Sequence, residues 1–311
     1  MNGQSEAPRA VPREVLQRIR RLQIRARKLV DNLFSGQYHA VFKGRGIEFS
    51  EVREYLPGDD IRIIDWNVSA RTGQLYVKKY VEERELTVYI MVDVSASNDF
   101  GTTARSKRDL AAEVAAILAL AAVDNKDRVG LVTFTDRIET YIEPGKGVQH
   151  VLRILRDLLY KQPAGRKTDI AAALSFLGRV AKRRSVVFLF SDFMDSGYEQ
   201  DLLITARRHD IVAFSLTDPR ELELPSIGMI ELEDSESGGR VLVDTSDANT
   251  RRLFRRHVGE QIQRRRRTLA ATHVDELPLR TDRPYVRPLL AYFRARAKGA
   301  GRMEREESVA V

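Results

Sequence analysis

The sequence contains no cysteine, and this absence excludes several classes of site at once. Disulfides, thiolate metal sites and cysteine nucleophiles are all removed, and a chain without cysteine suits a reducing cytosol. No run of about 18 uncharged apolar residues is present, so we expect no membrane span. The first residues, MNGQSEAPRAVPREVLQ, lack the apolar core of a signal peptide. We therefore expect a soluble, cytoplasmic protein.

The motifs of several common enzyme classes are also missing. The sequence has no G-x-S-x-G, no H-E-x-x-H and no G-x-x-x-x-G-K-[ST], which removes the usual signals of serine hydrolases, zinc proteases and P-loop ATPases. Histidine is scarce and scattered, at positions 39, 150, 209, 257 and 273. We therefore predict no catalytic residue and expect a protein that is not an enzyme.

The composition is that of a folded protein with a well-solvated surface. The chain has 311 residues, of which 43% are hydrophobic and 31% charged, and its formal net charge is +8. One domain of about 200 residues with appendages fits this length. The mild basic excess permits contact with acidic partners without requiring nucleic acid.

Short apolar segments alternate with amphipathic helical segments in the middle of the chain. LTVYIMV (86–92) and SVVFLFS (185–191) are apolar throughout, whereas 106–125 has its larger apolar residues at helical spacing. Strands that are apolar on both faces are typical of a parallel sheet covered by helices on both sides. The sequence therefore predicts an α/β fold with a doubly wound, mostly parallel sheet.

We predict the following division of the chain from these patterns. Residues 1–12 form a disordered N-terminus, 13–85 a basic helix and a β-rich region, 86–220 the α/β domain, 221–297 a β-hairpin with a C-terminal helical extension, and 298–311 a disordered tail. The arginines of the first basic helix are open to two interpretations, a solvated face or a surface for an acidic partner.

Oxygen-bearing side chains gather where the predicted strands end. Asp93, Ser95 and Ser97 follow the first apolar strand in VDVSAS, Asp192 follows the second, and Thr168 precedes a predicted helix. Taken alone, Ser97 fits a turn cap, and Asp169, next to Thr168, fits a helix N-cap. Because ligands gather outside the carboxyl ends of parallel strands, we expect these groups to converge. Two carboxylates and three hydroxyls suit Mg²⁺ or Mn²⁺.

This pattern resembles the metal-ion-dependent adhesion site (MIDAS) of von Willebrand factor A domains, D-x-S-x-S…T…D. The resemblance implies that Ser95, Ser97 and Thr168 bind the metal directly, and that Asp93 and Asp192 bind it mostly through water. It also implies that the metal accepts an Asp or Glu carboxylate from a protein partner.

A longer stretch resembles a bacterial family known as domain of unknown function 58. GRGIEFSEVREYLPGDDIRIIDWN, VDVSAS, SVVFLFSDFMD and LPLRTDRPYVRPLLAYFRAR carry this resemblance, over roughly residues 25–297. Asn98 departs from the pattern, since methionine commonly follows the second serine. The family implies an adaptor that works with a MoxR-type AAA+ ATPase or its client, in complex assembly or protein maturation.

GDDIRIIDW contains the densest polar cluster before the predicted sheet. Asp59, Asp60, Arg62, Asp65 and Trp66 fit either a tight turn, with a folded-in Trp and Arg62 paired to a carboxylate, or a second partner-binding surface anchored by Trp66. Both interpretations stay open at this point.

We therefore expect a Mg²⁺-dependent protein-interaction module, with two alternatives. One is a metal-dependent phosphohydrolase using Asp93, although Ser95 stands where a second carboxylate would act as acid or base. The other is nucleic-acid binding through the basic ends, although no aromatic residues alternate with the arginines to stack on bases. We expect no specific nucleic-acid affinity.

Overall fold

The structure is a computed structural model that describes residues 13–31, 38, 41–42, 48–81, 85–236 and 238–309. Its contacts divide the chain into two units, Met1–Val41 with Thr87–Val311, and Phe42–Leu86. The predicted disordered N-terminus, 1–12, lies outside the described residues.

A six-stranded sheet forms the centre of the larger unit, in the order β10-β7-β6-β3-β4-β5. Neighbouring strands are parallel except for β5, which runs antiparallel to β4 at one edge. The predicted doubly wound α/β fold is therefore confirmed. The strands are β3 (Thr87–Asp93), β4 (Arg128–Phe134), β5 (Ile138–Gly145), β6 (Val186–Ser191), β7 (Asp210–Thr217) and β10 (Asp275–Arg280).

The two central strands explain why the sequence is so apolar there. β3 is buried from Val88 to Asp93, and all of β6 is buried, because helices cover both faces of the sheet. The chain order reverses between β3 and β6, since β3 lies beside both β4 and β6. This reversal is the switch point at which open α/β sheets leave a crevice at the carboxyl ends of the strands.

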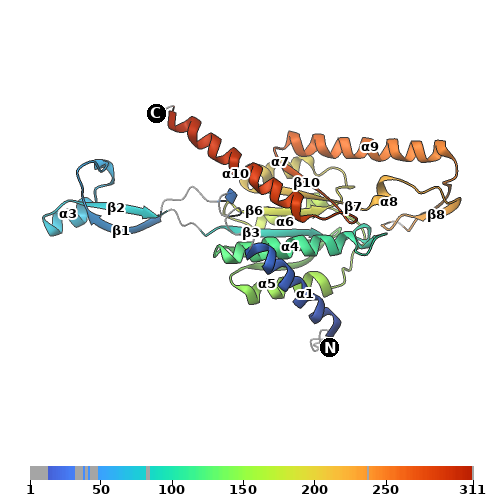
Figure 1. Ribbon diagram of the computed structural model, residues 1–311, viewed down its shortest axis with the longest axis horizontal. Helices are drawn as coiled ribbons and strands as arrows, with labels where there is room; N and C mark the ends of the chain where they lie inside the picture. Colours follow the sequence, from blue (N-terminus) through green and yellow to red (C-terminus); the bar gives the residue numbers. More distant parts are fainter. Residues whose placement is uncertain are drawn as a thin grey trace, which may run out of the picture. The chain divides into compact units, whose positions relative to one another are not determined.

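Helices pack on the two faces of the sheet (Figure 1). One face carries α4 and α5 with α1 packed against them, and α6, α7 and α9 contribute side chains to the core cluster on the other. The bounds are α1 (Arg13–Leu29), α4 (Lys107–Asp124), α5 (Val148–Tyr160), α6 (Ile170–Val180), α7 (Glu199–Arg208), α9 (Ala248–Ala271) and α10 (Val286–Val309). Short elements are η3 (Ala96–Asp99), α8 (Pro219–Leu222) and the hairpin of β8 (Met229–Glu233) and β9 (Arg240–Asp244).

Three arginines of α1 have acidic partners within this unit. Arg18 pairs with Asp109, Arg25 with Glu113 and Arg27 with Asp124, all on α4. Neither sequence interpretation anticipated this, because the complementary acids of α4 lie about 90 residues later in the chain. The basic face of α1 therefore docks partly on its own chain.

Two segments differ from the sequence expectations. The sixth strand, β10, was not expected, because Pro278 breaks its pattern. It fits at the sheet edge, where a missing N–H costs least. The structure also continues α10 to Val309 over part of the expected disordered tail, since Arg, Glu and Met favour helix.

The smaller unit is built on one antiparallel strand pair, β1 (Glu48–Glu54) with β2 (Tyr76–Val81). Between them lie η2 (Ile61–Ile63) and α3 (Trp66–Thr72). The predicted region 13–85 combined this unit with α1, whereas α1 packs in the larger unit. The spacing of apolar residues in α1 predicts a buried helix face, but it does not indicate which unit packs against that face.

Candidate functional site

Asp93 ends β3 and is fully buried. Its Oδ1 accepts a hydrogen bond from the backbone N–H of Ser95 at 3.0 Å, and its Oδ2 accepts one from the hydroxyl of Ser191 at 2.7 Å. Ser191 ends β6, so this bond joins the two central strands at the switch point. The sequence analysis missed Ser191, because a serine that ends an apolar strand carries no signal of its own.

The two serines of the D-x-S-x-S motif lie side by side. The hydroxyl oxygens of Ser95 and Ser97 are 3.0 Å apart, and Ser97 also hydrogen bonds to Asp192. The amide of Asn98 donates to the Ser95 hydroxyl at 3.3 Å. Asn98, which departs from the family pattern, is buried, and its hydrogen bond helps to hold the Ser95 hydroxyl in position.

The loop after β6 holds Asp192 in a constrained position. The backbone of Phe193 is left-handed, with φ 57°, a conformation that is rare for a bulky residue. The N–H of Met194 donates to Asp192 Oδ1 at 3.2 Å, and Arg265 of α9 donates to the Asp192 carbonyl at 3.3 Å. Contacts from two sides therefore keep the carboxylate at the strand edge.

Lys107 places a buried cation beside this carboxylate. Its ammonium donates to Asp192 Oδ2 at 2.8 Å and to Glu221 Oε1 at 2.6 Å, and its side chain is 1% exposed. The sequence analysis missed Lys107, since it is the first residue of α4 and is distant in the chain from both acids. Its position depends on how α4 packs against the sheet.

The charges at the strand edge are unequal. Burial and the negative charge of Asp192 raise the pKa of Asp93 to about 7. Burial also raises the pKa of Asp192, but the Lys107 charge and the hydrogen bonds outweigh it, so this pKa is lowered from its ordinary value. Asp192 is therefore the stable anion, whereas burial and the neighbouring charge of Asp192 disfavour the ionised form of Asp93.

Thr168 lies on a loop that is hydrogen bonded to the serine turn. The N–H of Ala96 donates to the Arg166 carbonyl at 3.0 Å, and Asp169 caps α6 by accepting from Ala172 at 2.7 Å. The predicted N-cap role of Asp169 is thus confirmed. The Thr168 hydroxyl donates to Oε1 of Glu236, at the tip of the β8–β9 hairpin, at 2.9 Å.

Glu236 is a third residue that the sequence analysis missed. Burial raises its pKa, the hydrogen bonds from Thr168 lower it, and the charge of Asp192 raises it further, so the net pKa is raised. Asp192 and Glu236 are therefore within electrostatic reach of each other. Of the five predicted residues, four are joined to one another by direct hydrogen bonds: Asp93, Ser95, Ser97 and Asp192. The fifth, Thr168, is connected to the serine turn through the backbone of its loop.

The donor set fits a hard divalent cation. Within the described part of the chain, no three or more His, Cys, Asp or Glu side chains gather closely enough to hold a metal, so a metal here would need the hydroxyls. Adjacent hydroxyls beside a buried carboxyl group offer the oxygen ligands that Mg²⁺ or Mn²⁺ prefers, and a bound cation would favour the ionised form of Asp93. Asp93, Ser95, Ser97, Thr168 and Asp192 would hold it.

The residues of GDDIRIIDW lie in the smaller unit and have separate local roles. Asp59 accepts two bonds from Arg53, at 2.8 and 2.7 Å, while Asp60 and Asp65 cap η2 and α3. Arg53, not Arg62, pairs with the carboxylate. Trp66 is 66% exposed, so the folded-in interpretation of this residue is wrong. Its exposure comes from its place as the first residue of a short helix.

Three other large apolar side chains of the smaller unit are exposed as well, those of Leu56, Ile61 and Leu75. The acids of GDDIRIIDW thus have partners in turns and caps, whereas the side chain of Trp66 is exposed to solvent. The predicted partner-binding role of this stretch stays a prediction.

None of the helices in the described ranges is long and apolar enough to cross a membrane.

Two solved structures resemble the arrangement of this chain. One is a conserved hypothetical protein, BatB from Bacteroides thetaiotaomicron, at 14% identity and a TM-score of 0.39, covering 71% of this chain and 99% of that chain. The other is the SpRpn10 VWA domain, at 9% identity and a TM-score of 0.39, covering 67% of this chain and 94% of that chain.

Sequence relatives cover more of the chain. Uncharacterized proteins of Mycobacterium bovis and Mycobacterium tuberculosis are each 34% identical over 286 residues, which are 91% of this chain and 90% of the relative. An uncharacterized protein of Mycobacterium avium is 32% identical over 141 residues, 45% of this chain and 83% of the relative. The family model described as "Protein of unknown function DUF58" matches residues 51–264, so the chain belongs to this family.

Proposed function

We propose that this chain is a metal-dependent protein-interaction module with a complete MIDAS-like site. Asp93, Ser95, Ser97, Thr168 and Asp192 hold one Mg²⁺ or Mn²⁺, and a protein partner adds an Asp or Glu carboxylate. The observation that carries this proposal is the pair of serine hydroxyls, 3.0 Å apart, next to a fully buried carboxylate at the sheet switch point.

The partner is proposed from the chemistry of the site and from the family. Serine and threonine hydroxyls are neutral ligands, so they leave the charge of the cation available to an incoming anion. In a protein, that anion is Asp or Glu. The family resemblance makes a MoxR-type AAA+ ATPase, or a protein that it remodels, the proposed donor.

We propose binding rather than catalysis for this site. A phosphohydrolase that used Asp93 as nucleophile would need a proton donor close by, and two residues later the chain has Ser95. A serine hydroxyl does not serve as a general acid near neutral pH. In the proposed module, the bound metal therefore mediates binding of the partner, and no reaction takes place.

The test combines metal titration with partner capture. We expect Mn²⁺ or Mg²⁺ to bind wild-type protein in calorimetry, to raise its melting temperature by linkage and to be removed by EDTA. Asp93→Ala and Thr168→Ala should lose metal binding while circular dichroism stays near wild type. Asp99→Ala, an acid just outside the motif, is the matched control and should titrate like wild type.

Capture of a MoxR-type AAA+ ATPase is then compared with and without EDTA. The proposal requires capture by wild type in Mg²⁺ and its loss in EDTA and in both metal-site variants. Absence of divalent binding in wild type would refute the metal site. Equal capture by all proteins in EDTA would place the interaction elsewhere, with the exposed Trp66 surface the first to test by Trp66→Ala.

A further inference from the structure

The β8–β9 hairpin brings an acidic side chain of the same chain to the candidate site. Glu236 accepts the hydroxyl hydrogen bond of Thr168 at 2.9 Å, together with a backbone hydrogen bond from Thr168. It is also within reach of the charge of Asp192. A carboxylate of the chain itself therefore lies against Thr168, which is one of the proposed metal ligands.

A second contact holds the hairpin tip in this place. The guanidinium of Arg166 donates to the carbonyl of Ser235 at 2.9 Å, and Arg166 and Thr168 lie on the same loop. The loop thus contacts two successive residues of the tip: Arg166 binds a backbone carbonyl, and Thr168 binds the next side chain. The bond from Arg166 holds the backbone of the hairpin tip in place, and the bond from Thr168 holds the carboxylate of Glu236.

The tip is shaped as a compact turn that presents this carboxylate. The N–H of Glu236 donates to Asp234 Oδ1 at 3.0 Å, and the N–H of Asp234 donates to the Gly239 carbonyl at 2.8 Å. The hairpin base is closed separately, because the hydroxyl of Thr245 donates to the Gly228 carbonyl at 2.6 Å. The hairpin can therefore keep its own structure when its tip leaves the loop.

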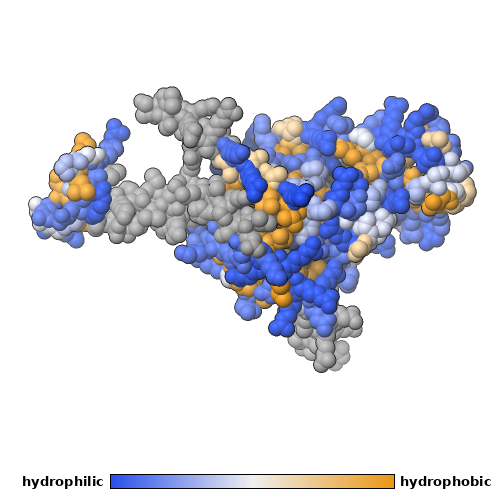
Figure 2. Space-filling model, in the orientation of Figure 1, coloured by the Kyte–Doolittle hydropathy of each residue, from blue (hydrophilic) through white to orange (hydrophobic). Residues whose placement is uncertain are grey.

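Little else in the hairpin is buried. Met229 is 58% exposed and Leu242 66% exposed, and apolar side chains are visible on this part of the surface (Figure 2). An element with few buried apolar contacts opens at a low free-energy cost. Detachment of the tip thus breaks polar contacts without disturbing the core of the sheet.

We propose that Glu236 is an internal carboxylate that competes with the partner for this site, and that the partner binds through an exposed acidic turn of the same kind. Such a turn offers an Asp or Glu to Thr168 and the metal, and the preceding carbonyl to Arg166. This inference rests on the proposed function. It restricts the acidic residues of the partner that could bind to those on an exposed turn in which the carbonyl of the preceding residue is also accessible.

The experiment uses acetate as the probe of the carboxylate position in full-length protein loaded with Mn²⁺. Paramagnetic broadening of the acetate methyl signal reports binding close to the metal. In Glu236→Ala we expect the apparent affinity for acetate to rise roughly tenfold or more, because an internal competitor bound by a charge-assisted hydrogen bond is removed. Glu231→Ala removes an exposed acid from the same hairpin and should behave as wild type.

A second variant distinguishes the effect of anchoring the hairpin tip from the effect of the Glu236 charge. Arg166→Met keeps Glu236 but removes the contact to Ser235, so acetate affinity should rise to a value between wild type and Glu236→Ala. Hydrogen exchange of 229–236 in EDTA should be faster in both variants than in Glu231→Ala, because the tip is no longer tied to the loop.

The outcomes distinguish this inference from the proposed function. If wild-type protein does not bind Mn²⁺, the metal site and the internal carboxylate are both refuted. If Mn²⁺ binds but acetate affinity and hairpin exchange are the same in wild type and Glu236→Ala, the metal site stands and the internal competitor is wrong.

Discussion

Lys107 has a strong effect on the charge of the candidate site. Its buried ammonium bridges Asp192 and Glu221. Burial lowers the pKa of Lys107, but the charges of the two acids outweigh this effect and raise it, so the side chain stays protonated. Asp192 therefore has a cationic partner within the chain, so a bound metal would chiefly favour the ionised form of Asp93.

Replacement of Lys107 by methionine should destabilise the protein most when metal is absent. The change leaves buried Asp192 without its cation, and breaking a buried ion pair costs about 3–5 kcal/mol. Urea unfolding in EDTA should show this loss, and Mg²⁺ should restore more stability to Lys107→Met than it adds to wild type. Lys182→Met, at an exposed position, should change the unfolding free energy by less than about 0.5 kcal/mol. An equal effect of Mg²⁺ on Lys107→Met and wild type would contradict this view of the site.

The loop before α6 is the element that positions Thr168. Glu139 accepts the N–H groups of Ala164 and Gly165, at 3.0 and 2.7 Å. A Cβ at Gly165 would lie 2.2 Å from the Thr135 hydroxyl oxygen and 2.9 Å from the Thr135 Cβ, and Thr135 is fully buried. Only glycine fits without moving the loop, so the placement of Thr168 depends on this residue.

We expect Gly165→Ala to weaken Mn²⁺ binding more than it weakens the fold. The added methyl group displaces the loop that carries Thr168, whereas the sheet core is distant from it.

Gly178→Ala is the matched control, because a Cβ at Gly178 meets nothing within 4 Å inside α6. Alanine there should stabilise the protein by about 0.5–1 kcal/mol and leave metal binding unchanged. Calorimetry and urea unfolding on both variants measure the two effects. Unchanged Mn²⁺ affinity in Gly165→Ala would show that the loop position does not matter.

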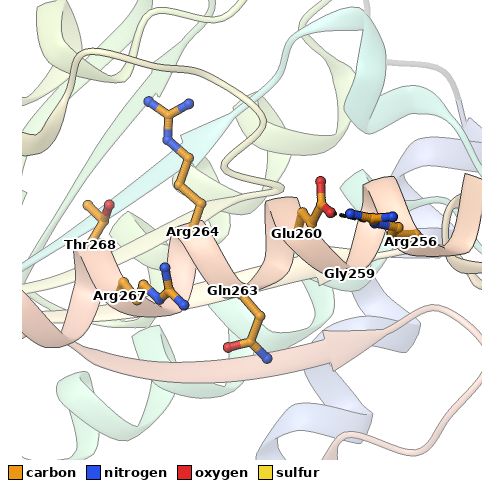
Figure 3. Close-up of a pocket in the computed structure, with 7 residues that line it drawn as sticks. All are labelled: Arg256, Gly259, Glu260, Gln263, Arg264, Arg267 and Thr268. Atoms are coloured by element: carbon orange, nitrogen blue, oxygen red, sulfur yellow. Dashed lines mark hydrogen bonds and ion pairs between the residues drawn. The ribbon is translucent and has the colours of Figure 1, made fainter. Parts of the chain in front are cut away.

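Several arginines of the two basic helices, α1 and α9, are paired with acids of the same chain. Three arginines of α1 face acids of α4. On α9, Arg256 pairs with Glu260 at 2.9 Å along an exposed face that also carries Arg264 and Arg267 (Figure 3). Arg264 in turn lies 3.8 Å from Glu199 of α7. This pairing lowers the charge that either helix offers to a nucleic acid.

Any affinity for DNA or RNA should therefore be weak and unspecific. Counterion release is the only driving force that this surface provides, so binding should fall steeply with salt. Fluorescence anisotropy with labelled oligonucleotides at low salt and at about 0.3 M salt measures it. Sequence-selective binding that persists at the higher concentration would favour the nucleic-acid alternative over the interaction module.

The parts of the molecule that were predictable are those with strong local patterns. The apolar runs at 86–92 and 185–191 are β3 and β6, and the polar residues that end them lie at one edge of the sheet. Asp169 is predictable as an N-cap from its place before an apolar helix. β10 was missed because a proline within a short segment disguises an edge strand. The binding of a metal or a partner stays a prediction.

Lys107, Ser191 and Glu236 could not be found in the same way. Each contacts the candidate site through a hydrogen bond between residues at least 68 positions apart in the chain. Local periodicity reports which face of an element is apolar, but it carries no information on which distant element covers that face. Their roles follow from the packing of α4, β6 and the β8–β9 hairpin around the strand edge.

The sequence by itself determined the fold class and the presence of oxygen-bearing side chains at the strand ends, because burial on both faces requires continuous apolar strands and parallel strands share one carboxyl edge. The tertiary structure alone decided the electrostatics of that edge. It placed Lys107 against Asp192 and Glu236 against Thr168, and it left Trp66 exposed. Charges act through space, so contacts that fold together from distant parts of the chain determine which carboxylate is compensated.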